Sequence, residues 1–211
     1  QGIRFVRRQA AMESLIVLAF LLTMLGLHIW SAFRLRADNR AARPQGYAGN
    51  PRPFAATFAS RTILMSGLII GAFLVFHLLH FAFEVKAVNL TGIDFSDLRD
   101  EAGRPHLYLM LLLAFGQWPV AVFYVLAVGL LCLHLSHGMR AMFQSIGWNW
   151  TFGGVAHLPN LIAKWGAVFI FVIYSSIPVA VLCGYEHERG YKAKELDRIA
   201  KAQAAGKGAA K

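Results

Sequence analysis

Histidines inside apolar runs are the residues whose type and spacing point to chemistry in this chain. Of the eight histidines, four lie within long apolar runs: His28, His77, His80 and His134. An ionisable side chain is costly in a membrane and by default indicates a functional site. The alternative for any one of them is an interhelical hydrogen bond. Several histidines at matched depth favour a shared ligand.

The depths of these histidines follow from the rise of about 1.5 Å per residue of an α-helix. His28 and His134 each lie six residues before an arginine that marks the end of the span, so both lie about 9 Å from the same membrane face. His77 lies 15 residues after Thr62, about 22 Å from that face. His28 and His134 can therefore face one another, whereas His77 belongs to a second site near the opposite face.

Paired histidines in an apolar helical bundle suit haem. Two neutral imidazoles from facing helices are the axial ligands that a bis-histidine haem needs. Porphyrin is wide and flat, so the helices beside it need small residues. The runs and their ends supply Gly26, Gly67, Gly71, Gly129 and Gly138. Close helix packing uses the same residue type, so spacing alone leaves haem binding and plain packing both open.

The elements that must hold these histidines are apolar helices. Hydrophobic residues make up 57% of the 211 residues and charged residues 15%, whereas soluble domains are about 25% charged. Four runs reach the roughly 20 residues that cross a bilayer, and they cover about 12–33, 62–83, 118–137 and 161–184. We expect an all-α integral membrane protein, with a transmembrane helical bundle over 1–184 and a basic polar tail over 185–211.

Charge and breaker residues organise the remaining chain. The net charge of +10 comes from Lys and Arg between and after the apolar runs, which is typical of membrane-flanking loops and excludes a nucleic-acid partner. The loop 34–61 carries six arginines and one acid, and the loop 84–106 carries five acids and three basic residues. The two loops therefore lie on opposite faces. Pro119 predicts a break between an interfacial segment, 107–115, and the third span.

Two stretches combine several short motifs. The first runs from Asn39-Arg40-Ala41-Ala42-Arg43-Pro44 through Ser60-Arg61-Thr62 and Ser66-Gly67 to Phe76-His77-Leu78-Leu79-His80-Phe81. The second runs from Phe123-Tyr124 through Leu133-His134-Leu135-Ser136-His137-Gly138 to Phe143-Gln144-Ser145-Ile146-Gly147. Over about Leu21 to Pro178 the chain resembles the cytochrome b subunit of succinate dehydrogenase and fumarate reductase, in the type where one chain carries five helices and two haems.

The resemblance implies a membrane anchor that passes electrons to menaquinone in the bacterial inner membrane, with a flavoprotein subunit and an iron–sulfur subunit as partners. It implies that His28 and His134 bind the haem b nearer the cytoplasmic iron–sulfur subunit, and that His77 binds the haem nearer the opposite face. The loop 34–61 is then cytoplasmic. Arg61 is a candidate partner of the haem propionates, with a membrane-flanking charge as its alternative role. No catalytic residue for succinate is implied.

The outer site departs from the family pattern. Family members have an earlier helix that supplies the partner of His77, and this sequence starts just before the family's second helix. We expect that helix to be missing from the sequence or to come from another polypeptide. The potential ligands near this face are His77, His80, Cys183 and His187. A Rieske-like [2Fe–2S] cluster, which needs two His and two Cys, is the alternative to a second haem.

Two other functions remain as alternatives. One is the cytochrome b anchor of another respiratory dehydrogenase, such as a hydrogenase or a formate dehydrogenase. The other is a small membrane transporter that uses the histidines as a relay.

Cys132 and Cys183 are interpreted as small apolar residues rather than a disulfide framework.

Overall fold

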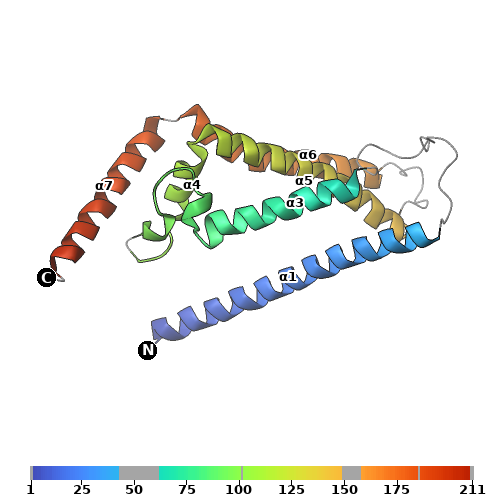
Figure 1. The fold of residues 1–211 in the computed structure, drawn as a ribbon, viewed down its shortest axis with the longest axis horizontal. Helices are drawn as coiled ribbons and strands as arrows, with labels where there is room; N and C mark the ends of the chain where they lie inside the picture. Colours follow the sequence, from blue (N-terminus) through green and yellow to red (C-terminus); the bar gives the residue numbers. More distant parts are fainter. Residues whose placement is uncertain (1, 43–61, 101, 149–157, 185, 210–211) are drawn as a thin grey trace. The chain divides into compact units, whose positions relative to one another are not determined.

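The computed structural model describes residues 2–42, 62–100, 102–148, 158–184 and 186–209. Figure 1 shows the helices α1 (Gly2–Ala41), α3 (Ile63–His77), α4 (Leu107–Phe115), α5 (Trp118–Ser145), α6 (Leu158–Cys183) and α7 (Glu186–Ala209). A π-helical turn, Leu78–Ala82, continues α3, and two short 3₁₀ turns follow at Lys86–Val88 and Phe95–Asp97. Within the described residues, the regular elements are therefore all helices, and an isolated antiparallel bridge joins Arg99 to Pro105.

Four helices in these ranges are long and apolar enough to cross a membrane: Leu15–Ala41, Ile63–Ala82, Trp118–Ser145 and Leu158–Cys183. The prediction of an all-α protein with four apolar spans is confirmed. The helix α5 continues past the predicted end of its span at His137, because a membrane boundary does not interrupt helical hydrogen bonds. It stops where Gly147 adopts a φ of 77°, the left-handed conformation that commonly ends helices.

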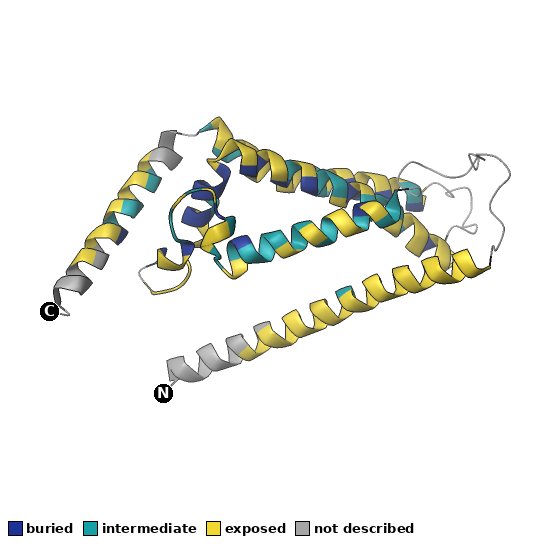
Figure 2. Ribbon diagram, viewed as in Figure 1, coloured by how far each residue is buried: buried dark blue, intermediate teal, exposed yellow. Residues whose placement is uncertain are grey.

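The chain divides into two compact units, residues 1–56 and 57–211. The helix α1 belongs to the first unit. Its described side chains are exposed except for that of Leu25, which is intermediate (Figure 2). The apolar ones include Leu18, Phe20 and Trp30. Among the described residues of its unit, nothing covers the apolar surface of α1, as expected of a helix that contacts lipid or another helix.

In the second unit, α5 runs antiparallel to both α3 and α6. Ser66 near the start of α3 lies beside His134 in the second half of α5, and His80 after the end of α3 lies beside Tyr124 near the start of α5. Arg140 near the end of α5 bonds Asn160 near the start of α6. Helices that cross a membrane in succession alternate in direction, so antiparallel neighbours are expected in such a bundle.

The segment between α3 and α4 is folded against the helices. Phe95 and Leu98 are buried with the first turns of α5. Glu84 has a φ of 52° and accepts two hydrogen bonds from the Arg99 guanidinium, at 3.0 and 2.9 Å. A bidentate pair of this kind is stronger than a single hydrogen bond. The predicted loop 84–106 is thus a packed cap at one end of the α3–α5 pair.

The polar tail forms α7, which contacts α4. The Glu195 carboxylate accepts hydrogen bonds from Arg198 and lies 3.3 Å from Nε2 of His106. Arg198 also donates to the Arg99 carbonyl at 3.2 Å. Ile199 is buried in the same core as Phe95. The tail therefore lies on the same side of the molecule as the segment 84–106.

We expect Glu195→Gln to loosen α7. The neighbouring Arg198 lowers the pKa of the Glu195 carboxyl, so the contact is present above the unfolded pKa and is lost as the pH falls through the lowered one. Limited proteolysis at neutral pH should cut within α7 roughly fivefold faster than in the unaltered protein, as expected for the loss of about 1 kcal/mol. The control Asp197→Asn removes an exposed pair with Lys201 and should leave the rate unchanged. Equal rates for the two variants would show that Glu195 does not hold the helix.

Candidate functional site

A polar cluster lies between the first turn of α3 and the second half of α5. Nδ1 of His134 lies 3.2 Å from Oγ of Ser66, and the same hydroxyl donates to the Ile63 carbonyl at 3.0 Å. A hydroxyl has one proton to donate, so it accepts from the Nδ1–H of His134. We assign the tautomer that carries its lone pair on Nε2. Fixing one ring nitrogen by a hydrogen bond to orient the other is typical of metal-ligating histidines.

Gly67 allows this close approach of the imidazole to α3. A Cβ added there would lie 3.2 Å from Cε1 of His134, closer than ordinary van der Waals contact. At Gly129 an added Cβ would meet Phe171 at 3.5 Å, an ordinary packing distance. Among the glycines singled out in the sequence, Gly67 is thus the one that the described structure brings against a candidate ligand.

His28 lies on α1, in the other compact unit, where its side chain is exposed. The pairing of His28 with His134 therefore stays a prediction, based on their equal depth and on the resemblance.

A second polar cluster lies at the other end of α3 and α5. Its centre is the phenol of Tyr124, which lies 3.1 Å from Nδ1 of His80 and 3.5 Å from Nδ1 of His77. A phenol can donate one hydrogen bond and accept others, so it can accept from one imidazole and donate to the other. Within the described residues, Nε2 of His80 is buried without a hydrogen-bond partner. The arrangement can hold or pass a proton between two imidazoles.

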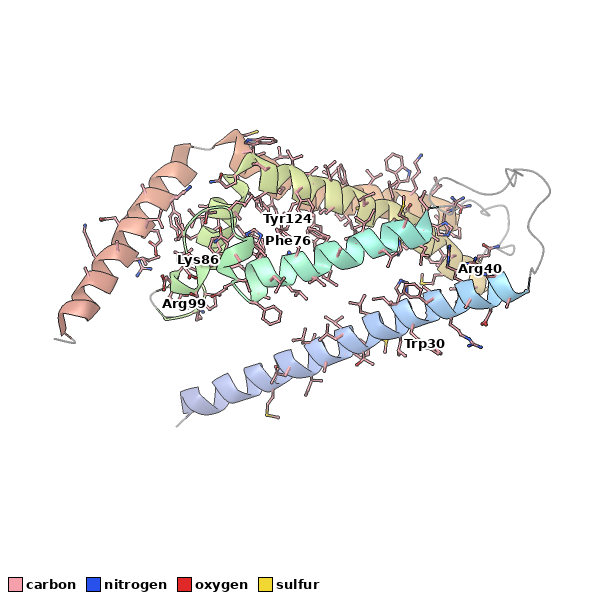
Figure 3. The ribbon with its side chains drawn as sticks, in the orientation of Figure 1. Trp30, Arg40, Phe76, Lys86, Arg99 and Tyr124 are labelled. Atoms are coloured by element: carbon pink, nitrogen blue, oxygen red, sulfur yellow. The ribbon has the colours of Figure 1, made fainter. Side chains whose placement is uncertain are left out.

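Aromatic rings enclose this second cluster. The His80 ring stacks on Phe81 at 4.3 Å and on Phe95 at 5.6 Å between centroids. The edge-to-face partners of Tyr124 include Phe73 and Phe115, at 5.1 and 5.0 Å. Figure 3 shows Tyr124 beside Phe76 between α3 and α5. His80 is only 1% exposed, so the rings exclude water and leave the polar groups to contact one another.

The two clusters are well separated along both helices. Ser66 and His77 are 11 residues apart on α3, and Tyr124 and His134 are 10 residues apart on α5. These spacings correspond to about 16 and 15 Å of helix rise. The agreement between the two helices places His77 and His134 in different sites, in line with the depths derived from the sequence.

The remaining predicted ligands do not join these clusters. Cys183 is an exposed free thiol and Cys132 a buried one. In the described part of the chain, no three His, Cys, Asp or Glu side chains form a group that could hold a metal ion, so Cys183 forms no such group with His77 and His80. Arg61 and the His187 side chain lie outside what the structure describes.

Ser66 and Tyr124 were not predicted as site residues, although both belong to the quoted motifs. The signal for each was a hydroxyl in an apolar span, since buried polar groups need partners. Because α3 and α5 are antiparallel, Ser66 near the start of α3 meets His134 late in α5. Tyr124 near the start of α5 meets His77 at the end of α3.

Comparison with known proteins gives no match: no family model, no curated protein and no solved structure is significantly similar to this chain. The resemblance to the succinate dehydrogenase anchor therefore rests on the quoted motifs.

Proposed function

We propose that this chain is the membrane-anchor cytochrome b subunit of a succinate:quinone oxidoreductase in a bacterial inner membrane. The observation that carries the proposal is the contact of His134 with Ser66 and Gly67. It gives a histidine in an apolar span the tautomer with an unprotonated Nε2, which ligation of haem iron needs. A flavoprotein subunit and an iron–sulfur subunit complete the enzyme, and the loop 34–61 faces them in the cytoplasm.

We assign haem b to the inner site. His134 and His28 would hold its iron, and Gly67 lets the His134 ring lie close against α3. Haem b supplies a one-electron carrier between the iron–sulfur partner and the quinone. This chain provides the axial nitrogens, their orientation through Ser66 and a low-dielectric surrounding. Arg61 is the proposed partner of a propionate.

The outer cluster is the proposed second redox site, near the face opposite the loop 34–61. His77 would be the ligand there, either to a second haem b or to a [2Fe–2S] cluster, with a helix from outside this stretch completing the site. Tyr124 orients His77 in the way that Ser66 orients His134. His80, buried against Phe81 and Phe95, takes part through its hydrogen bond to Tyr124.

A visible spectrum of the protein, purified with its native partners, tests the proposal. We expect the dithionite-reduced sample to show b-type haem bands, and flavin and iron–sulfur subunits to copurify. A protein without haem bands would favour a transporter. Haem bands with hydrogenase or formate dehydrogenase subunits in place of the flavoprotein would assign the chain to another respiratory anchor.

We expect Ser66→Ala to weaken the inner site. The variant removes the acceptor of the His134 Nδ1–H, and loss of such an outer hydrogen bond typically lowers ligand affinity about 10–100-fold. The inner haem should be lost more readily on dilution in detergent, and its midpoint potential should shift. Ser176→Ala is the matched control, because the Ser176 hydroxyl only bonds the Ile173 carbonyl of its own helix. Unchanged haem retention and potential in Ser66→Ala would mean that Ser66 does not position the ligand.

A further inference from the structure

An apolar groove of about 1100 Å³ runs along the contact between α5 and α6. Its walls include Gly129 and Leu133 of α5 and Val168 and Phe171 of α6. Gly129 keeps the groove open, since it adds no side chain between the helices. Val168 is 41% exposed, so the groove opens on the surface of the second unit.

One end of this groove is basic. The Nε–H of Arg140 donates to Oδ1 of Asn160 at 2.9 Å, which holds the guanidinium at the groove. Lys164 lies one helical turn after Asn160 and also lines the groove. Its Nζ lies 5.7 Å from the centroid of the Trp165 ring, and tryptophan is enriched at the level of lipid head groups. Both cations lie at the same end of the groove, because α5 and α6 are antiparallel and Arg140 lies late in α5 while Lys164 lies early in α6.

No acidic residue of this region balances these two charges. The sequence contains no Asp or Glu from 102 to 185, and Arg140 and Lys164 are its only Lys or Arg residues from 105 to 185. The ion pairs found among the described residues involve neither of them. Two cations at one end of an apolar groove therefore favour an anionic ligand with an apolar tail.

We propose that the groove between α5 and α6 binds one anionic phospholipid. Its phosphate contacts Arg140 and Lys164, and an acyl chain lies along Gly129, Leu133 and Val168. A neutral quinone head group would leave both cations uncompensated, whereas a phosphate pairs with both. Basic pockets between membrane helices bind anionic head groups in this way. The site does not depend on the electron-transfer role of the protein.

The test uses the intact protein with its native partners in phosphatidylcholine vesicles that contain spin-labelled phosphatidylglycerol or spin-labelled phosphatidylcholine. Electron paramagnetic resonance measures the motionally restricted fraction of each label. We expect the protein to prefer phosphatidylglycerol, and the double variant Arg140→Gln/Lys164→Gln to lower that preference about fivefold for each lost charge. The control Lys86→Gln/Lys194→Gln removes two exposed charges outside the groove and should keep the preference.

A second variant separates a bound lipid from general attraction to basic residues. Val168→Trp fills the apolar part of the groove at an exposed position and keeps both cations, so the restricted phosphatidylglycerol should be lost. The proposal is overturned if the unaltered protein shows no preference, or if either the double variant or Val168→Trp keeps it. Because the readout is lipid mobility, its result is independent of haem content and of quinone reduction.

Discussion

Replacing either His28 or His134 with Ala is expected to abolish the same haem. Loss of one axial ligand leaves the iron with a single protein bond in an apolar site, and the low-spin bis-histidine state cannot form. The two variants should therefore lack the same component of the reduced spectrum and the same low-spin resonance. The effect is all-or-none for that haem, which makes it one of the two largest effects expected for this protein.

His137→Ala is the matched control, because His137 lies on α5 one turn beyond His134. It should keep the full spectrum. The experiment also reports on the arrangement of α1, since His28 belongs to the unit of residues 1–56 and His134 to the other. A normal low-spin spectrum in either the His28 or the His134 variant would show that the two histidines are not a pair.

His77→Ala is expected to leave the inner haem intact and to reduce quinone reduction at least tenfold. The helix rise separates the two clusters by about 15 Å, so loss of His77 should not reach His134. Tyr124→Phe should impair the same step, since it removes the hydroxyl shared by His77 and His80. Tyr174→Phe, on the exposed face of α6, is its control. Unchanged quinone reduction in His77→Ala would show that His77 has only a packing role.

The outer site also bears on the expected additional helix. Desolvation of an unpaired imidazole argues for an outside partner, but Nδ1 of His77 lies 3.5 Å from the Tyr124 hydroxyl. One ring nitrogen of His77 therefore has a hydrogen-bond partner within this chain. The expectation of a ligating helix from elsewhere now depends on the resemblance and on the remaining ring nitrogen. A structure of the complete complex, examined at His77, decides whether such a helix contributes a His or Cys.

The sequence predicted the spans well because hydropathy and helix breakers act locally. Apolar runs of sufficient length located the four membrane helices, and Pro119 lies in the first turn of α5, directly after the break. The contacts of His134 with Ser66, and of His77 with Tyr124, depend on how α3 and α5 are rotated about their axes. Both helices are apolar on most of their surface, so the hydrophobic pattern does not fix that rotation.

The structure of the C-terminal tail could not be predicted from its composition. That composition is basic and polar, and it predicted only a polar segment after the last span. The helix α7 is nonetheless held against the segment 84–106 by two apolar residues, Leu196 and Ile199, and by Glu195 with Arg198 and His106. A few contacts among many solvated charges leave little signal in the sequence.

The central claim is that this chain holds haem b, and the most direct test is the amount of haem b and iron bound per chain. The measurement is made on protein purified with its native partners, by the pyridine haemochrome spectrum and by elemental analysis. We expect one haem b per chain for the inner site. For the outer site we expect either a second haem or two iron atoms beyond those of the haem and of the iron–sulfur subunit. Protein that is folded, complete and free of haem would contradict the account.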